Sequence, residues 1–215
     1  MTPKNLTRVY SMLLTHFGHR GWWPGDTPFE IIVGAILTQN TAWKNVEKAI
    51  ANLKAAKALS YKAIHQLPQP MLADLIRPSG YYNQKAKKLH AFTQFLKTEC
   101  RGSLTQLFQE ETGRLRERLL SVKGIGPETA DSILLYAAEK PVFVIDLYTY
   151  RVVTRHGWLP EDTTYQEMQY FFQDRLPVDV ALYKDFHAQL VAVGNRFCRR
   201  TPSCEGCPLR CVLPG

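Results

Sequence analysis

Apolar side chains recur every three or four residues along most of the chain, and polar side chains fill the positions between them. This period is typical of α-helices that bury one face. Thr27-Pro28-Phe29-Glu30 matches a capping box with proline at the first helical position. Thr41 is the predicted cap of the following helix. Such stripes predict helices over residues 6–17, 29–37, 46–53, 84–96, 127–138 and 179–197, and one that is capped by Thr163 or Thr164 and ends at Phe172.

The alternation that is typical of a strand is confined to the short run Val142–Ile145. Pro68, Pro70 and the Pro78-Ser79-Gly80 sequence interrupt the helical pattern and predict short helices and turns. We find no internal repeat and no low-complexity segment. The sequence therefore predicts an all-α protein.

Composition narrows the class of partner. At 215 residues and 45% hydrophobic, the chain can form one large or two small domains around a sizeable core. Its formal net charge of +8 favours an anionic partner, nucleic acid first, because binding releases the counterions of the phosphate backbone. The sequence shows neither a signal peptide nor a long apolar span, so we expect a cytoplasmic monomer with no membrane association.

The stretch from Leu119 to Ala130 predicts two helices joined by a tight turn. Gly124 and Gly126 flank Ile125, and glycines permit a sharp turn that exposes backbone N–H groups. Pro127 stands where the second helix should begin. Exposed N–H groups at the start of a helix can bind a phosphate. A simple helical hairpin with a glycine-rich turn is the alternative for this motif alone.

The hairpin, with Thr129-Ala130 behind it and Asp146 after a short apolar run, resembles the helix-hairpin-helix and catalytic aspartate of the endonuclease III superfamily of DNA glycosylases. The resemblance implies two helical domains flanking a groove for duplex DNA: a six-helix barrel over residues 27–139 and a second domain from 1–26 and 140–215. It implies that Asp146 is catalytic, although helix capping is an alternative role. The DNA-binding residues it implies are Gln39, Lys123, Gly124, Ile125, Gly126 and Thr129.

The resemblance also implies a monovalent cation, K⁺ or Na⁺, held by the carbonyls of Leu120, Val122 and Ile125 in the hairpin. Members that cut the strand after removing the base carry a lysine two residues after the second hairpin glycine. That position is Glu128 here, and a carboxylate cannot form a Schiff base with the sugar. Lys123 lies in the turn and is expected to meet phosphate. The resemblance therefore implies a glycosylase without lyase activity.

Three of the four tryptophans cluster near the start of the chain: Trp22 and Trp23 before Pro24, and Trp43 after Leu-Thr-Gln-Asn-Thr. An apolar plug between domains is one interpretation. Stacking around a flipped base is the other, and indole rings attract a cationic ring such as an alkylated purine. These motifs, the run from Arg77 to Lys87 and the hairpin resemble the 3-methyladenine DNA glycosylase III branch. This resemblance implies that the pocket for the flipped base is formed by Trp22, Trp23, Pro24, Trp43 and Glu128.

Four of the five cysteines form a C-terminal cluster, Cys198, Cys204, Cys207 and Cys211. In a cytosolic chain this indicates metal ligation, by zinc or by an iron–sulfur cluster. The resemblance implies a [4Fe–4S] cluster. The first and last intervals between these cysteines are shorter than is usual in the superfamily. The six histidines show no metal-binding spacing and are expected to be structural.

The sequence thus favours a monofunctional DNA glycosylase of base excision repair that removes alkylated purines, 3-methyladenine and 7-methylguanine, from duplex DNA. Three alternatives stay open. The same scaffold could serve a uracil or mismatch glycosylase, or an endonuclease III-like glycosylase with lyase activity. The chain could also be a non-catalytic helix-hairpin-helix DNA-binding module with a structural metal, although binding alone needs neither Asp146 nor the tryptophans.

Overall fold

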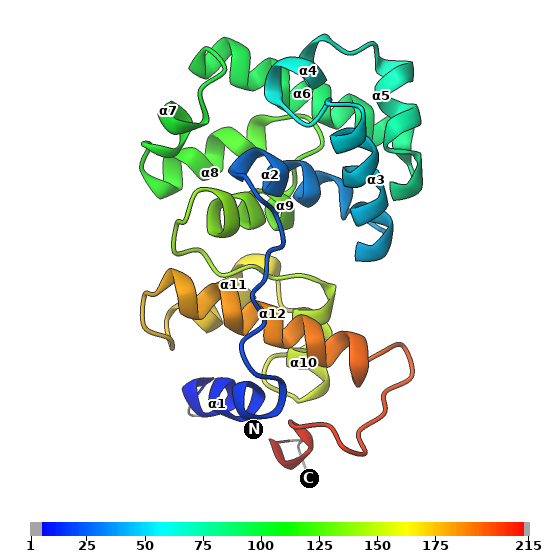
Figure 1. Cartoon of the computed structure of the whole chain (residues 1–215). Coiled ribbons are helices and arrows are strands. Elements are labelled where there is room, and N and C mark those ends of the chain that lie inside the picture. The colour runs from blue at the N-terminus through cyan, green and yellow to red at the C-terminus, as the bar shows by residue number, and fades with distance from the viewer. Residues whose placement is uncertain (1–5, 213–215) are drawn as a thin grey trace. The chain divides into compact units, whose positions relative to one another are not determined.

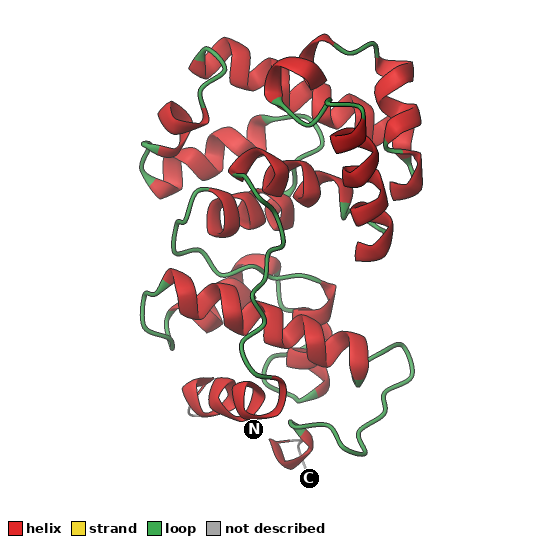
Figure 2. Ribbon diagram, viewed as in Figure 1, coloured by secondary structure: helices red, strands yellow, loops and turns green. Residues whose placement is uncertain are grey.

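The computed structural model describes residues 6–212 and divides the chain into two compact units. The N/C-terminal unit comprises Met1–Trp23 and Pro141–Gly215, and the central unit comprises Pro24–Lys140. Every regular element of the described residues is helical (Figure 2). The prediction of an all-α protein is confirmed.

The central unit is organised around one buried helix, α2 (Pro28–Leu37). From Phe29 to Leu37, all its side chains except that of Ile31 are buried, because α2 packs against α3, α6, α9 and η2. Figure 1 labels the other α-helices of this unit. The bounds of its remaining elements are α3 (Trp43–Ala55), α4 (Tyr61–Gln66), α5 (Gln69–Leu75), η1 (Arg77–Ser79), α6 (Tyr82–Cys100), α7 (Leu104–Phe108), α8 (Thr112–Ser121), α9 (Pro127–Ser132) and η2 (Ile133–Ala137).

The structure can be compared with the two N-terminal caps that the sequence predicts for α2 and α3. The Thr27 hydroxyl accepts a hydrogen bond from the Glu30 N–H at 3.1 Å, as the capping pattern predicts. The prediction for Thr41 is wrong: Ala42 occupies the capping position of α3. Thr41 instead accepts a hydrogen bond from the Asn45 side chain at 3.2 Å, because the helix begins one residue later than the hydroxyl would require.

The second hairpin helix does not continue as a regular α-helix. After Ser132 it widens into a π-helical turn, η2, in which the Ala138 N–H bonds to the Ile133 carbonyl at 2.9 Å. All five residues of η2 are buried against α2 and α8. The apolar stripe predicted the buried face but not the change in helical pitch.

The N/C-terminal unit contains α1 (Leu6–Phe17), α10 (Leu147–Arg155), α11 (Tyr165–Gln173), α12 (Val180–Arg196) and η3 (Arg210–Val212). Its aromatic core places the Phe143 ring parallel to that of Phe172, with centroids 4.2 Å apart. Helix α12 lies against α10 in Figure 1, and the two are in close contact at Gly194, where an added Cβ would lie 2.4 Å from Tyr148. Glycine is therefore required at this crossing.

The Val142–Ile145 run is extended but does not pair with another strand in the described residues. Side chains of α11 satisfy its backbone instead. The Phe143 N–H donates to Gln173 Oε1 at 2.9 Å, and Gln169 Nε2 donates to the Phe143 carbonyl at 2.8 Å. This anchored segment delivers Asp146 to the start of α10.

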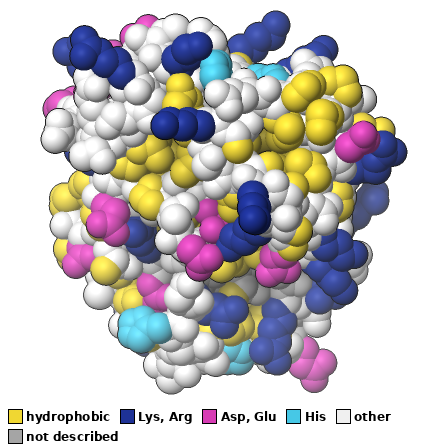
Figure 3. Space-filling model, turned by 45° about the horizontal axis from the view of Figure 1, so that its top comes forward, with side chains coloured by type: hydrophobic (Ala, Val, Ile, Leu, Met, Phe, Trp, Pro, Cys, Tyr) yellow, Lys and Arg dark blue, Asp and Glu magenta, His cyan; other side chains and the backbone are white. Residues whose placement is uncertain are grey.

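Within residues 6–212, no helix combines the length and apolar character needed to cross a membrane. Figure 3 shows that, on the face in view, Lys and Arg side chains lie among acidic and apolar ones rather than in one separate patch. The net positive charge therefore does not by itself locate a nucleic-acid interface on this face.

Candidate functional site

Helices α8 and α9 form a hairpin, residues 112–132, that an internal ion pair holds together. The Arg116 guanidinium donates two hydrogen bonds to the Asp131 carboxylate, at 2.7 and 3.1 Å. Asp131 is fully buried, and a bidentate guanidinium is the partner that such a carboxylate requires. The two helices are thus fixed relative to each other.

The turn of the hairpin is shaped by its glycines. Gly124 has φ +92°, and a Cβ there would lie 2.5 Å from Cγ of Lys88. Ile125 is buried and anchors the turn, whereas Lys123 and Gly126 are exposed. A Cβ on Gly126 would meet nothing within 4 Å, so the backbone there is open to close approach by another molecule.

Gln39 joins the end of α2 to this hairpin. Its Nε2 donates to the Gly124 carbonyl at 3.2 Å and to Thr129 Oγ1 at 2.9 Å, and its Oε1 accepts from Lys88 Nζ. Thr129 is buried, so its hydroxyl serves this network. The structure therefore brings Gln39, Gly124 and Thr129 together, and their role in DNA binding stays a prediction.

Lys85 differs from the neighbouring lysines of α6. Its side chain is buried, and its Nζ donates to the carbonyls of Leu37 at 2.9 Å and Ser79 at 2.6 Å. Burial, followed by the nearby charge of Lys88, lowers the pKa of Lys85 to about 8. Lys85 therefore caps the end of α2 immediately before Gln39.

Two further predicted features lie at the hairpin: Glu128 at the start of α9 and the carbonyls that precede it. Glu128 lies in the first turn of α9, where a carboxylate is favoured by the helix dipole. The Val122 carbonyl accepts a hydrogen bond from the Ile125 N–H at 3.0 Å. A carbonyl oxygen has a second lone pair, and the monovalent cation at this turn stays a prediction.

Asp146 begins α10 and caps it. Its Oδ1 accepts a hydrogen bond from the Thr149 N–H at 2.7 Å, and its side chain is only 13% exposed. Burial acts to raise the pKa of Asp146, but the nearby His187 and the Thr149 N–H outweigh it, so the pKa lies below its ordinary value. The capping role that the sequence allowed is present, and it leaves Oδ2 for other interactions.

His187 is the residue of this site that the sequence analysis missed. Its Nε2 lies 3.7 Å from Oδ2 of Asp146, which is an electrostatic contact longer than a hydrogen bond. A structural role alone was expected for this histidine. The position on a buried face of α12 was the available signal, but the proximity to Asp146 arises only from the packing of α12 on α10.

The tryptophans belong to different units. Trp22 and Trp23 are half-buried neighbours in the N/C-terminal unit, with ring centroids 5.4 Å apart. Pro24 is the first residue of the central unit. Trp43 starts α3 of that unit, and its indole N–H donates to Glu47 Oε1 at 3.0 Å. Their membership of one base pocket stays a prediction.

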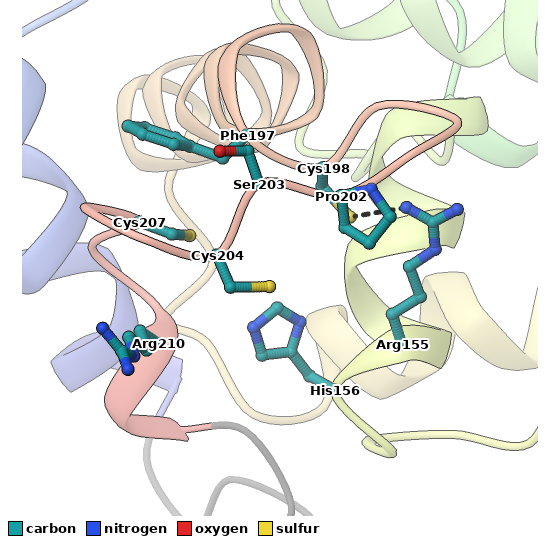
Figure 4. Close-up of a pocket in the computed structure, with 9 residues that line it drawn as sticks. All are labelled: Arg155, His156, Phe197, Cys198, Pro202, Ser203, Cys204, Cys207 and Arg210. Carbon is teal, nitrogen blue, oxygen red and sulfur yellow. Dashed lines mark hydrogen bonds between the residues drawn. The ribbon is translucent and has the colours of Figure 1, made fainter.

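The C-terminal cysteines lie in the segment from Cys198 to Cys211, named here the cysteine loop. A cavity of about 320 Å³ is lined by three of the thiols and by basic side chains at the end of α10 (Figure 4). The Arg155 guanidinium donates to Cys198 Sγ at 3.5 Å and also binds the backbone carbonyl of Arg200 at 3.1 Å. The lining groups relevant to a metal are Cys198, Cys204, Cys207, Arg155, His156 and Arg210.

Three of the four predicted metal ligands line this cavity. Within residues 6–212, no three His, Cys, Asp or Glu side chains lie close enough together to hold a single metal ion. The thiols instead surround an open space. Cys211 is exposed and does not line the cavity. His156 does line it: Nδ1 contacts the Val152 carbonyl at 2.7 Å, while Nε2 is buried without a hydrogen-bond partner among the described residues.

The chain is similar to known DNA repair proteins over most of its length. A candidate DNA repair glycosylase of Methanocaldococcus jannaschii is 44% identical over 205 residues, which cover 94% of this chain and 93% of the relative. Endonuclease III of Thermotoga maritima is 29% identical over 184 residues, covering 85% of this chain and 81% of the relative.

Two solved structures are similar over nearly the whole chain. The H. pylori 3-methyladenine DNA glycosylase bound to 1,N6-ethenoadenine has a TM-score of 0.79 and 32% identity, covering 91% of this chain and 98% of its own. An endonuclease III–DNA complex has a TM-score of 0.84 at 21% identity, covering 99% and 96%, which shows the shared fold. The HhH-GPD superfamily pattern matches residues 33–177, so this chain belongs to the HhH-GPD superfamily of base excision DNA repair proteins.

Proposed function

We propose that this protein is a monofunctional DNA glycosylase that hydrolyses the N-glycosidic bond of alkylated purines in duplex DNA. The observation that carries the proposal is Asp146, a mostly buried carboxylate whose pKa lies below its ordinary value, at the position of the superfamily's catalytic aspartate. The similarity to the H. pylori 3-methyladenine glycosylase supports the choice of substrate.

The chemistry requires an anion rather than a strong acid. An N3- or N7-alkylated purine carries positive charge, so it accepts the bonding electrons when the glycosidic bond breaks and leaves as a neutral base. Positive charge then develops on the sugar, where ionised Asp146 would stabilise it. Water attacks C1′ and transfers a proton to the carboxylate. The target nucleotide must first be flipped out of the helix.

Base recognition is assigned to indole stacking. Trp22, Trp23 and Trp43, with Pro24, are the proposed stacking surface for the flipped base, since an electron-rich ring attracts a cationic purine. Trp22 and Trp23 keep part of their surface accessible in the structure. Glu128 is the proposed polar group of this pocket, and a carboxylate there would add further attraction for a cationic base.

We also propose, from the residue at position 128, that the protein has no lyase activity. A Schiff base requires an amine, and Glu128 stands where strand-cutting relatives carry lysine. Lys123 is the nearby amine, and it is exposed on the turn, where a strand phosphate is the proposed partner. The product is therefore an intact abasic site.

The hairpin is proposed to hold the DNA strand. Gly126 leaves its backbone open, and the N–H groups of the turn and the start of α9 suit a phosphate. Gln39 is the proposed residue that fills the space left by the flipped nucleotide. Its amide is fully bonded within the hairpin network, so that role would require these bonds to be exchanged for contacts with DNA.

We also propose that the cysteine loop holds a [4Fe–4S] cluster. The donor set fits: Cys198, Cys204 and Cys207 face one cavity, and Arg155 supplies positive charge beside the thiolates. Such a cluster would order the loop and supply no open catalytic position. Cys211 is the proposed fourth ligand. His156 is the alternative, because its unpartnered Nε2 lies in the cavity wall.

A panel of lesion-containing duplexes tests the proposed reaction. The purified protein should release 3-methyladenine and 7-methylguanine, and alkali should then cleave the DNA at the resulting abasic sites. Release of uracil or of a mismatched base alone would favour the alternative glycosylases. A borohydride-trapped protein–DNA adduct would contradict the monofunctional assignment, and binding without release of any base would leave only a DNA-binding module.

A further inference from the structure

We propose that His187 is the positioning residue for the catalytic aspartate: from α12 it holds Oδ2 of Asp146 in the orientation and the ionised form that the reaction uses. The inference rests on the proposed role of Asp146. It concerns a group on a different helix, far from Asp146 in sequence, and it follows from the distances around the two carboxylate oxygens.

The two oxygens of Asp146 have different surroundings. Oδ1 is bound by the Thr149 N–H at 2.7 Å, which fixes the carboxylate to the first turn of α10. Oδ2 faces Nε2 of His187 at 3.7 Å. Because the cap occupies Oδ1, Oδ2 is the oxygen left for water and sugar, and the imidazole is placed to set its orientation.

The position of His187 is fixed by close helix packing. Its side chain is 4% exposed. Gly194 lies seven residues later on the same face of α12, and it permits the near contact with Tyr148, two residues beyond Asp146. Phe186, immediately before His187, is fully buried against Phe143 and Phe172. The imidazole therefore cannot move without disturbing the core of the unit.

Electrostatics explain why a buried catalytic carboxylate needs this neighbour. Burial favours the protonated form of Asp146, which could not stabilise a cationic sugar. His187 and the capping N–H oppose burial and keep the pKa low. From the neighbouring elements, His187 of α12 faces the carboxylate, and the Tyr165 hydroxyl of α11 accepts from the adjacent Ile145 N–H at 3.4 Å. Replacing His187 therefore tests whether it keeps Asp146 ionised.

The experiment compares the wild type with His187→Gln and His187→Ala. Gln189→Ala is the matched control, because Gln189 is a buried polar residue of the same helix that bonds to Gly18 and Asp185 rather than to Asp146. Single-turnover base release is measured from pH 4 to 8.5, together with DNA affinity. The carboxyl titration of Asp146 is followed by NMR in the DNA-free protein, with Asp146→Asn used to assign its signal.

We expect the acid limb of the rate profile to move upward by about one pH unit in both His187 variants. Because the pKa of Asp146 starts below its ordinary value, base release should fall by about two- to fourfold at pH 4 and stay unchanged at pH 8. DNA affinity should stay unchanged, and the Gln189→Ala profile should keep its shape. A loss that is equal at every pH, or no loss, would overturn the proposal. If the alanine variant does not fold, the rate profile of His187→Gln alone tests the role of His187.

The NMR titration separates this inference from the proposed function. If the wild type releases no base from any lesion, the proposed function fails, yet the Asp146 carboxyl should still titrate at higher pH in His187→Gln than in the wild type. An unchanged titration would overturn the role of His187 irrespective of the substrate.

Discussion

The hairpin and the cysteine loop both carry predicted functional residues, but they satisfy their polar groups in opposite ways. In the hairpin, Gln39 uses both ends of its amide and Asp131 is paired with Arg116. In the cysteine loop, the thiols form no disulfides. Beside the loop, at the end of α10, Nε2 of His156 is buried without a hydrogen-bond partner among the described residues. Buried polar groups are normally satisfied. The polar groups around the hairpin are therefore satisfied within the fold, whereas the thiols of the cysteine loop stay available for the proposed cluster.

Asp146→Asn should produce the largest effect, and it should leave both regions intact. The substitution keeps the shape of the cap but removes the negative charge, so base release should fall by about 10²- to 10⁴-fold. Single-turnover assays on alkylated duplex measure this loss. Duplex affinity and metal content should match the wild type. Full activity in a folded variant would show that Asp146 is only a helix cap.

Cys204→Ser tests whether the cysteine loop holds the proposed cluster. We expect loss of most iron and of the visible absorption of the purified protein, because the cavity loses one of its three lining thiols. Limited proteolysis should then cut the cysteine loop sooner, while cleavage near the hairpin stays unchanged. A colourless wild type with stoichiometric zinc would contradict the iron assignment.

The fourth ligand can be identified by the same iron measurement. Under the proposed ligand set, Cys211→Ala should reduce the iron content below that of the wild type, and His156→Ala should retain it. The opposite result would assign the ligand to His156, whose imidazole already lines the cavity. Iron and sulfide analysis, with electron paramagnetic resonance to detect three-iron clusters, distinguishes the two.

Gly124→Ala tests whether the hairpin is complete before DNA binds. Gly124 has φ +92°, and the new Cβ would press on Lys88, so the free energy of unfolding should fall by about 1–3 kcal/mol. Gly126→Ala is the matched control, because its φ is −97° and its Cβ would meet no atom within 4 Å. Chemical denaturation should separate the two variants. Gly126→Ala should weaken DNA binding without loss of stability, and equal stability of both variants would contradict the argument.

Gln39→Ala should have the smallest effect on the free protein. It removes hydrogen bonds between the end of α2 and the hairpin, at a cost of about 1 kcal/mol in the free energy of unfolding. Base release from a duplex should decrease more than binding to undamaged DNA if the glutamine fills the space of the flipped nucleotide. Thermal unfolding and single-turnover kinetics measure the two effects, and parallel losses would restrict Gln39 to the hairpin network.

The helical content, most caps and the hairpin could be predicted because they depend on neighbours close in sequence. The Thr27 cap, the Pro127 start of α9 and the positive φ of Gly124 are all local consequences of residue type. One local expectation differed from the structure: Thr41 does not cap α3, because the helix begins one residue later than its hydroxyl would require.

The sequence by itself determined the inventory of this protein: an all-helical chain, a glycine-shaped hairpin, an aspartate after an apolar run and a cluster of thiols. Tertiary structure alone decided which of these groups meet. The approach of His187 to Asp146, the bonds from Gln39 to Gly124 and Thr129, and the absence of Cys211 from the cavity lining all depend on helix packing. Side-chain pairs distant in sequence leave no periodic signal, because periodicity records only which face of a helix is buried.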